Sequence, residues 1–401
     1  MGFLPLKVGD QSNICPRKSL LALLKLWNES MNPSAPSSFA IPPGGLGAGV
    51  HSGYEPRHPI SQRKWSHEPF PISGASGPES LAFDRHGDGP YTGVSDGRII
   101  KWDRNQSRWI NFATTTPFRD GCEGSEDHVN TEARCGRPLG LSFDHKTGDL
   151  YIADAYMGLL AVGSKGGLAT PVVQEVHGFP FKFLNDLVID QDSGAIYFTD
   201  TSTRFERREF ANVMFSGDNS GRLLKFDPRN NEVTVLLHNL MFPNGVALSK
   251  NGDFLLVAET TNSRILRYWL EPSSKLGKVE VFANLPGRPD NIKRNQNGEF
   301  WVAANSEKGG LFNWILSRPR LGNFLARIHF DFTKLDSLFG NPDDAYAFAI
   351  RLSENGDTLE TIESSEGETL KYISDVDEES GGSLWVGSVV RPFAIKLNAS
   401  N

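Results

Sequence analysis

The sequence predicts an all-β protein, a six-bladed β-propeller that follows an irregular N-terminal extension. From about residue 73 onward, short runs of Val, Ile, Leu, Phe and Tyr are separated by Gly-Asp, Asn-Gly and Ser-Gly turns, which is typical of successive β-hairpins. Long helical periodicity is absent. A pair of strands also recurs in one phase along this part of the chain, which indicates a repeat architecture.

Composition limits the class of protein. Of the 401 residues, 38% are hydrophobic and 22% are charged, which is enough to bury a large core and excludes a wholly disordered chain. The 41 basic and 48 acidic side chains give a net charge of -7, so we expect no nucleic-acid partner. No apolar run approaches the roughly 18 residues that cross a bilayer, so we expect a soluble protein without a transmembrane segment.

The chain divides into two regions by composition. Residues 1–72 are rich in Pro, Gly and Ser and are expected to form an extension, whereas residues 73–398 are expected to form the propeller. The apolar stretch at residues 19–24 is interrupted by Lys25 and lacks a clear small-residue cleavage site. We therefore predict no cleavable signal peptide.

The repeat consists of two strands joined by a polar turn. Five segments open in the same phase, at residues 77–83, 137–143, 183–189, 242–248 and 288–294. A second apolar strand follows each of them, at residues 91–94, 150–154, 196–200, 254–258 and 300–303. A weaker sixth copy runs from residues 372–376 into 384–387. Six copies leave roughly 50 to 55 residues each, enough for a four-stranded sheet, and such sheets arranged radially form a propeller.

The third residue of each opening is the candidate functional position. The innermost strand of every blade lines the central channel of a propeller, so residues of equal phase form a ring at one depth. The ring is predicted to contain Glu79, Leu139, Asn185, Asn244, Asp290 and Ser374. Four of these, Glu79, Asn185, Asn244 and Asp290, offer the carboxylate and amide oxygens that Ca²⁺ prefers. No Cys or His shares the phase, which argues against zinc or copper.

An ordinary structural interpretation of these residues also exists. Asn and Asp are common at turns and strand starts, and the Asn244-Gly245 pair taken singly is more typical of a turn than of a ligand. Four oxygen donors in matching phase, one of them a Glu with poor turn propensity, favour metal binding. Two carboxylates in a narrow channel without a cation would also be electrostatically unfavourable.

The cysteines and glycosylation motifs leave the compartment open. Cys122 and Cys135 would close a ring of about fourteen residues, and a disulfide there would stabilise the fold by about 3 kcal/mol. Two unrelated reduced thiols are the alternative, and Cys15 has no obvious partner. Possible N-glycosylation motifs occur at Asn28, Asn105 and Asn398, and such motifs are common by chance.

The sequence resembles the strictosidine synthase-like proteins, members of a superfamily of six-bladed propellers that also contains calcium-dependent gluconolactonases and paraoxonases. The similarity is carried by residues 77–83, 91–101, 134–137, 162–164, 181–186, 197–202, 221–227, 257–259, 268–270 and 291–295. The resemblance implies a disulfide between Cys122 and Cys135, and a plant protein of the secretory pathway, in the vacuole or outside the cell. It also implies that Glu79, Asn185, Asn244 and Asp290 match the hydrolases' calcium ligands.

The position of the synthases' catalytic glutamate is the main departure from the family pattern. Strictosidine synthases condense tryptamine with the aldehyde secologanin, and the resemblance assigns the place of their general acid/base glutamate to Ser374. An alkyl hydroxyl does not exchange protons near neutral pH as a tuned carboxyl does. Asp375 could substitute only if the alignment were shifted by one residue.

The leading hypothesis is therefore a calcium-dependent hydrolase of a small ester or lactone. Glu79, Asn185, Asn244 and Asp290 would bind the ion, and Asp290 would also activate water or attack the substrate. Asp186 and Asn291, which are expected to point away from the ligand phase, would orient the ligands from a second shell. One alternative is a condensing enzyme that joins an amine to an aldehyde in alkaloid biosynthesis. Another is a non-catalytic propeller with a structural metal.

Overall fold

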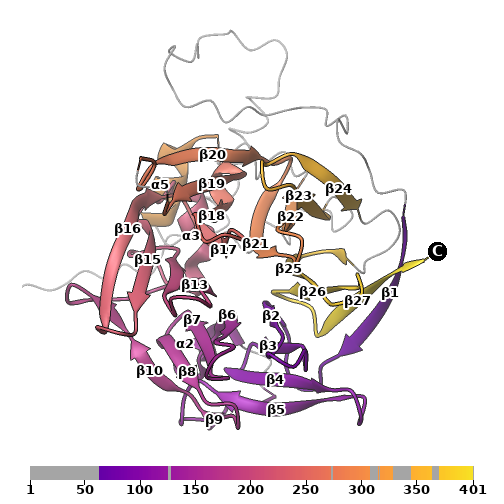
Figure 1. Ribbon diagram of the computed structural model, residues 1–401. Coiled ribbons are helices and arrows are strands. Elements are labelled where there is room, and N and C mark those ends of the chain that lie inside the picture. Colours follow the sequence, from indigo (N-terminus) through magenta and orange to yellow (C-terminus); the bar gives the residue numbers. More distant parts are fainter. Residues whose placement is uncertain are drawn as a thin grey trace, which may run out of the picture. The chain divides into compact units, whose positions relative to one another are not determined.

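The propeller predicted from the repeats is present in the protein. The computed structural model describes residues 63–124, 128–271, 274–307, 315, 317–327, 345–363 and 370–400, all within the compact unit His51–Asn401. Six antiparallel sheets surround a central axis as blades, so the all-β, six-bladed architecture is confirmed (Figure 1).

Each blade is a sheet whose first strand lies nearest the axis, and the blades follow one another along the chain (Figure 1). Blade one contains β2 (Leu81–Ala82), β3 (Tyr91–Gly93), β4 (Arg98–Asp103) and β5 (Arg108–Thr114), with β9 (Gly167–Leu168) added in parallel at its edge. Blade two contains β6 (Pro138–Phe143), β7 (Leu150–Asp154), β8 (Gly158–Val162) and β10 (Thr170–Val173). Blade three contains β13 (Leu184–Ile189), β14 (Ile196–Asp200), β15 (Gly221–Asp227) and β16 (Glu232–Leu240).

The second half of the chain repeats this arrangement. Blade four contains β17 (Pro243–Leu248), β18 (Phe254–Glu259), β19 (Arg264–Trp269) and β20 (Val279–Asn284). Blade five contains β21 (Arg288–Arg294), β22 (Phe300–Glu307), β23 (Ala345–Leu352) and β24 (Thr358–Glu363). Blade six contains β25 (Ile373–Glu378), β26 (Leu384–Ser388), β27 (Phe393–Ser400) and β1 (Lys64–Pro71).

The strand β1 joins the two ends of the propeller. It pairs with β27 along its whole length, from Lys64 opposite Ser400 to Pro71 opposite Phe393. These residues were expected in the N-terminal extension, because their Pro-containing sequence does not match the repeat. Pro69 and Pro71 suit an outermost strand, which has one unpaired edge. Blade six is thus built from both ends of the described chain, and this closes the ring.

Helical segments lie in the connections between strands. They are α2 (His128–Cys135), η1 (Arg207–Glu209), α3 (Phe210–Phe215), η2 (Thr260–Asn262) and α5 (Pro319–Arg327), and a small hairpin is formed by β11 (Glu175–Val176) and β12 (Phe179–Pro180). The helices α3 and α5 are in contact, since the Asn323 side-chain amide donates to the Ser216 carbonyl at 2.7 Å.

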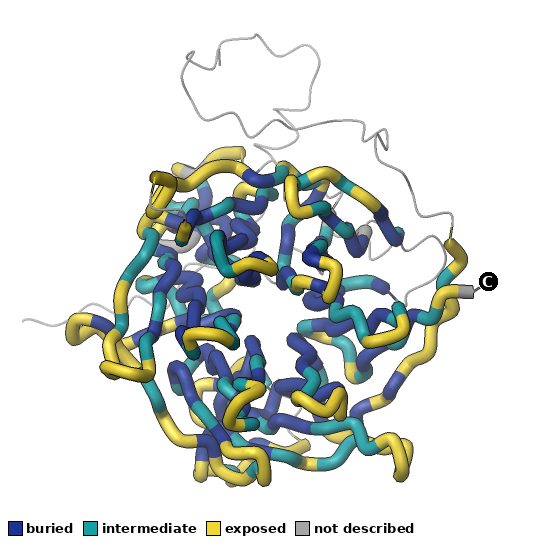
Figure 2. The backbone as a smooth tube through the Cα atoms, in the orientation of Figure 1, coloured by how far each residue is buried: buried dark blue, intermediate teal, exposed yellow. Residues whose placement is uncertain are grey.

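The hydrophobic core is divided into sectors between neighbouring blades. In one sector Phe254 and Leu256 of blade four pack with Ile292, Phe300 and other side chains of blade five. Equivalent clusters lie at the other blade boundaries, and Figure 2 shows the inner strands buried and the outer strands and turns exposed. Because each sheet is covered on both faces, its central strands are nearly continuous apolar runs.

A β-bulge interrupts the innermost strand at the ring position. In blade three, Leu184 pairs with Asp200 and Leu187 with Phe198, so three steps along β13 correspond to two along β14. The innermost strands of blades two, four, five and six contain a comparable extra residue. A bulge breaks the alternation of side chains between the two faces of a strand. Two successive residues of each opening are therefore able to face the channel.

Gly245 lies where the bulges of blades four and five approach one another. A Cβ atom at this position would be 2.5 Å from the Ile292 nitrogen and 2.6 Å from the Asn291 Cα, both backbone atoms. We expect Gly245→Ala to lower the free energy of unfolding by about 1–3 kcal/mol, because the backbone has to move to admit the methyl group. Urea denaturation checks this. Gly163→Ala is the matched control, since its nearest neighbour would lie at 3.8 Å, and equal stabilities of the two variants would contradict the expectation.

Candidate metal centre

The predicted ring residues come from the inner strands of several blades and meet at the axis. The side-chain amide of Asn291 donates to Glu79 Oε1 at 3.2 Å, although the two residues are 212 positions apart. The side chain of Asn244 hydrogen-bonds to Asp290, which in turn lies close enough to Glu79 to raise its pKa. Asn185 occupies the equivalent position in β13, and its side chain is buried. Blades one, four and five thus contribute polar side chains to one linked group, and Asn185 occupies the equivalent position in blade three.

The oxygens of this group lack hydrogen-bond donors. Within the described part of the chain, four buried side-chain oxygens of the group accept no hydrogen bond: Glu79 Oε2, Asn185 Oδ1, Asn244 Oδ1 and Asn291 Oδ1. A buried acceptor without a partner costs about 1–3 kcal/mol. Four such acceptors gathered at the axis are the arrangement that a hard cation satisfies, because Ca²⁺ takes six to eight oxygen ligands.

Two threonines fix the direction of the asparagine amides. Asn185 Nδ2 donates to Thr201 Oγ1 at 3.0 Å, and this hydroxyl donates to the Pro243 carbonyl at 2.8 Å. The same arrangement occurs in blade four. Asn244 Nδ2 donates to Thr260 Oγ1 at 3.3 Å, and that hydroxyl donates to the Pro289 carbonyl at 2.7 Å. A hydroxyl that donates its one proton to a carbonyl can only accept a hydrogen bond from the amide. The amide nitrogen therefore faces the threonine, and the oxygen is left for the channel.

The hydrogen bond from Asn185 to Thr201 predicts a loss of cation affinity in the Thr201→Val variant. Valine has nearly the same shape but leaves Asn185 Nδ2 without an acceptor, so the amide is free to rotate its oxygen away. We expect calcium affinity to fall by about 10–100-fold, measured by calorimetric titration. Thr201→Ser should restore binding, and Thr234→Val on the exposed part of β16 is the matched control. Unchanged affinity in Thr201→Val would show that the amide orientation has no part in binding.

The carboxylates of the group carry raised pKa values. Burial, followed by the charge of Asp290, raises the pKa of Glu79. Burial is also the main reason that the pKa of Asp290 rises from 3.8 to about 7, and the neighbouring Asp375 and Asp186 add to the rise. A bound cation would oppose these effects by favouring the ionised forms. Asp290 is also partly exposed, whereas Glu79, Asn185 and Asn244 are buried, so Asp290 is the most exposed of these four side chains.

The residues predicted to form a second shell take two different positions. Asp186 and Asn291 both lie in the bulges, where the expected alternation fails. Asn291 contacts Glu79 directly and has a free oxygen, so its side chain lies within the group. Asp186 accepts from the Val246 backbone at 3.0 Å through Oδ2, which ties blade three to blade four. Its Oδ1 has no partner.

The other two ring positions do not offer free oxygens to the axis. Leu139 is buried in an apolar cluster with Phe183, Phe242 and residues of α3. Ser374 is fully buried, and its hydroxyl donates to the Glu79 carbonyl at 2.6 Å. The neighbouring Asp375 accepts from the Leu81 backbone at 2.8 Å and from the Val376 backbone at 3.0 Å. Ser374 thus holds Glu79 in place, and Asp375 ties blade six to blade one.

Helix α2 is linked to η1 next to the ring. The buried Glu132 of α2 accepts from Arg207 Nη1 at 2.7 Å and from the Tyr156 hydroxyl at 2.5 Å. The charge of Arg207 in turn lowers the pKa of Asp290.

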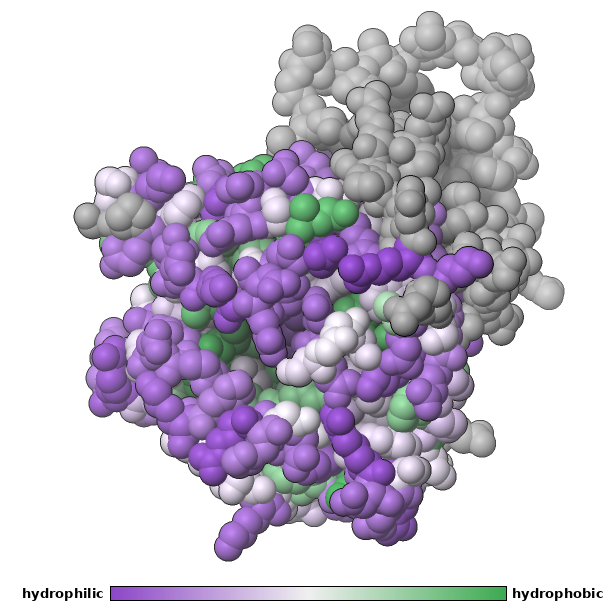
Figure 3. Space-filling view, turned by 45° about the vertical axis from the view of Figure 1, so that its right-hand side comes forward, coloured by the Kyte–Doolittle hydropathy of each residue, from purple (hydrophilic) through white to green (hydrophobic). Residues whose placement is uncertain are grey.

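The described part of the face shown in Figure 3 is mostly hydrophilic, with small apolar patches near its middle.

The predicted disulfide is confirmed, and it anchors the end of α2. Cys122 and Cys135 are bonded with a Cα–Cα distance of 5.6 Å, and both are fully buried.

Cys15 and Asn28 lie outside the described residues. Asn105 is exposed in the turn between β4 and β5, whereas Asn398 is partly buried in β27, with its Oδ1 accepting from Ser383.

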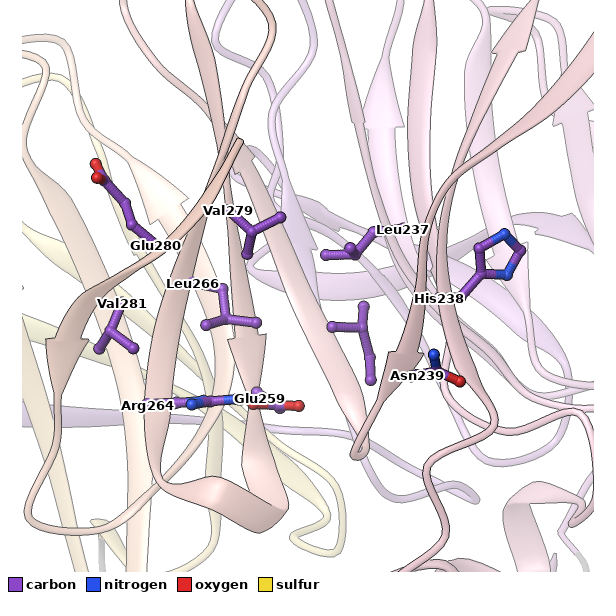
Figure 4. Close-up of a pocket in the computed structure, with 10 residues that line it drawn as sticks. Leu237, His238, Asn239, Glu259, Arg264, Leu266, Val279, Glu280 and Val281 are labelled. Carbon is purple, nitrogen blue, oxygen red and sulfur yellow. Dashed lines mark hydrogen bonds and ion pairs between the residues drawn. The ribbon is translucent and has the colours of Figure 1, made fainter. Parts of the chain in front are cut away.

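A surface groove lies between β16 of blade three and strands β18, β19 and β20 of blade four (Figure 4). Its charged side chains are already paired, since Glu259 accepts from Arg264 Nε at 2.5 Å and from the Met241 backbone at 2.9 Å. Among the described residues, no group of three or more His, Cys, Asp or Glu side chains is placed to bind a metal. The axial group differs from such clusters because three of its four free oxygens belong to side-chain amides, those of Asn185, Asn244 and Asn291.

Comparison with known proteins identifies the family. Residues 185–273 match the family model for strictosidine synthase, and residues 68–102 match the model for the N-terminal part of strictosidine synthase-like proteins. Protein strictosidine synthase-like 10 of Arabidopsis thaliana is 52% identical over 324 residues, which cover 80% of this chain and 85% of the relative. The chain belongs to the strictosidine synthase-like family.

Solved structures resemble this family member in fold. A gluconolactonase from Xanthomonas campestris is 14% identical with a TM-score of 0.55, over 84% of this chain and 90% of the other. Regucalcin from Agrobacterium tumefaciens, described as a calcium-binding protein, is 16% identical with a TM-score of 0.52, over 82% of this chain and 95% of the other. No helix among the described residues is both long and apolar enough to span a membrane.

Sequence reasoning missed the threonines of the site. Thr201 and Thr260 each follow their asparagine by 16 residues, so they also occupy equal phases in two blades. This equal spacing is a signal that a comparison of the second strands would have found. Lys293, which also faces the axis, has no counterpart of equal phase in the other repeats, and only its surroundings reveal it.

Proposed function

We propose that this strictosidine synthase-like protein is a calcium-dependent hydrolase of a small ester or lactone. The observation that supports the proposal is the set of four buried oxygens without donors, on Glu79, Asn185, Asn244 and Asn291, together with the partly exposed carboxylate of Asp290. These residues fit a calcium ion in donor type and in number, if water or substrate supplies the remaining ligands. Bound there, Ca²⁺ would polarise a substrate carbonyl and stabilise negative charge on its oxygen.

Asp290 is the general base in this proposal. Its pKa is raised to about 7 in the metal-free protein. A bound cation would lower this pKa again, so the Asp290 carboxylate would be ionised near neutral pH in the calcium-loaded protein and able to accept a proton. It takes a proton from water while the water oxygen bonds to the carbonyl carbon. The bond from that carbon to the alcohol oxygen then breaks, and the proton passes from Asp290 to the departing oxygen. Atoms and charge balance without another reactant.

The condensing-enzyme alternative lacks its acid/base group. Ser374 is bound to the Glu79 carbonyl, and Asp375 is bound to two backbone amides. Neither side chain is free to exchange protons with a substrate. Purified protein supplied with tryptamine and secologanin after chelation is expected to give no condensation product, and formation of product would support the alternative.

Calcium stoichiometry and a substrate panel together test the proposed hydrolase. We expect one calcium ion per chain by calorimetric titration, and calcium-dependent turnover of at least one member of a panel of lactones and aryl esters. Binding without any turnover would favour the non-catalytic propeller with a structural metal. Absence of binding would refute the proposal.

The response to calcium is expected to depend on pH. Because the pKa of Asp290 is raised from 3.8 to about 7, the folded metal-free protein retains a proton that the unfolded chain releases. Its stability therefore falls as pH rises from about 4 through 7, and a bound cation removes this loss. Calcium should raise the melting temperature more at about pH 8 than at about pH 6, measured by differential scanning fluorimetry against a chelator. Equal shifts at both pH values would contradict this.

We also propose that the protein passes through the secretory pathway to the vacuole or the cell exterior. The buried disulfide supports this, because such bonds persist in oxidising compartments. Asn105 is the glycosylation site that its exposed turn favours, whereas the side chain of Asn398 is engaged in blade six. Localisation of a fluorescent fusion in plant cells, and a mass shift on deglycosylation that Asn105→Gln removes, test these statements.

A further inference from the structure

The ring position of blade two holds no oxygen donor. Its residue is Leu139, which is buried in an apolar cluster, and Tyr156 from the connection after β7 packs against the same cluster. The Tyr156 hydroxyl donates to Glu132 Oε1 at 2.5 Å, and Glu132 Oε2 accepts from Arg207 Nη1 at 2.7 Å. A short chain of contacts thus links Arg207 to the one blade whose ring residue is apolar.

The guanidinium of Arg207 is fixed at one nitrogen. Its partner Glu132 belongs to α2, whose last residue, Cys135, is held by the disulfide. The Glu132 side chain is 2% exposed, whereas that of Arg207 is 19% exposed. Among the described residues Glu132 is the one acceptor for Arg207, so Nε and Nη2 have no acceptor there. This edge of a guanidinium binds a carboxylate through two parallel hydrogen bonds.

A second arginine next to the ring does not offer such an edge. Arg137 is fully buried, and it donates to the Gly77 carbonyl at 2.9 Å and to the Val389 carbonyl at 3.4 Å. Burial, followed by the charge of Arg207, lowers the pKa of Arg137 to about 10. Burial raises the pKa of Asp290, and the charge of Arg207 opposes that rise. Arg207 therefore lies near both residues, and of the two arginines it is the one that a ligand can reach.

We infer that Arg207 binds a carboxylate of the substrate, so that the ester or lactone hydrolysed at this site is an anionic one. The inference deepens the proposed function and rests on it for the position of the scissile carbonyl. A substrate with a carboxylate a few carbon atoms from its carbonyl would have a separate partner for each group. A neutral ester of the same length would lack the second partner.

Matched para-nitrophenyl esters test the inference. The monoesters of succinic, glutaric and adipic acid carry a free carboxylate, and the butanoate, pentanoate and hexanoate esters are their neutral counterparts of equal chain length. In saturating calcium we expect kcat/KM of the best anionic ester to exceed that of its counterpart by about 10–100-fold, the usual effect of a hydrogen bond to a charged group. Arg207→Gln should abolish this preference. Arg208→Gln is the matched control and should keep it, because that exposed side chain pairs with Glu206 instead.

A double variant and a binding measurement cover the case of a destabilised or inactive protein. Arg207→Gln/Glu132→Gln removes both charges of the pair, so no buried carboxylate is left without its partner. Calorimetric titration in saturating calcium compares each dicarboxylate with the monocarboxylate of equal length. The unaltered protein should bind the best dicarboxylate about 10-fold or more tightly than its counterpart, and the double variant should bind the two equally.

The outcomes separate this inference from the proposed function. Tighter dicarboxylate binding that depends on Arg207, but without turnover of any ester, would support the anion site and refute the hydrolase. Equal kcat/KM for anionic and neutral esters, or a preference that persists in the folded double variant, would overturn the inference and leave the hydrolase intact. Absence of both turnover and selective binding would overturn both.

Discussion

Asp290→Asn is expected to lower ester or lactone hydrolysis by about 10²–10⁴-fold, which is the usual contribution of a positioned general base. Asparagine keeps the shape of the side chain and an oxygen for the hydrogen bond from Asn244, but it accepts no proton. Initial rates with the best substrate of the panel, measured in saturating calcium, check the prediction. Saturation matters because Asp290 is also a proposed ligand.

Asp192→Asn is the matched control for this variant. Asp192 lies in the exposed turn between β13 and β14, away from the axis, so the same chemical change there should leave the rate unchanged. Circular dichroism of both variants establishes that the propeller is retained. Full activity in a folded, calcium-loaded Asp290→Asn protein would remove Asp290 from the mechanism.

Glu79→Gln is expected to weaken calcium binding by about 100-fold or more, since even outer-shell partners of a metal are worth about 10–100-fold. The change removes one of the two carboxylates of the ring and places an amide beside atoms that have no donors. It also removes the cost of burying a charge, and the repulsion by Asp290, which together raise the pKa of Glu79 in the metal-free protein. The variant should therefore be at least as stable as the unaltered protein in chelator, but should gain little from calcium.

Thermal unfolding with and without calcium distinguishes this from a general structural defect. The exposed Glu175→Gln of β11 is the matched control and should keep the full calcium-induced shift. A Glu79→Gln protein with an unaltered shift would show that calcium binds elsewhere, and the axial assignment would fail. A variant that is destabilised equally with and without calcium would show that Glu79 serves the fold rather than the ion.

The repeat made much of this molecule predictable. The strands of blades two to six begin within a residue or two of the predicted positions, because alternation of apolar residues and turn residues are local properties of the chain. The equal phase of Glu79, Asn185, Asn244 and Asp290 is also a property of the sequence. The structure has Asn185, Asn244 and Asp290 in the bulges of their inner strands and Glu79 just before β2. The disulfide followed from the family resemblance, since spacing alone left both alternatives open.

The sequence repeat did not predict the pairings between segments that are distant in the chain. Nothing in residues 64–71 matches it, and these residues become a strand only because β27 offers them an unpaired edge. The bulges similarly arise where neighbouring blades crowd together at Gly140 and Gly245. They bring Asn291 to Glu79, although strict alternation would point the two apart.

Sequence alone determined which residues recur at one depth of the channel, because phase along a strand is set by neighbours in the chain. Tertiary structure decided what those residues do there. Thr201 turns the Asn185 oxygen to the axis, Ser374 holds the Glu79 backbone, and Lys293 meets the Asp375 carboxylate of blade six. Each of these contacts joins separate blades or strands, and its strength depends on burial and on the charges around it, which exist only once the ring has closed.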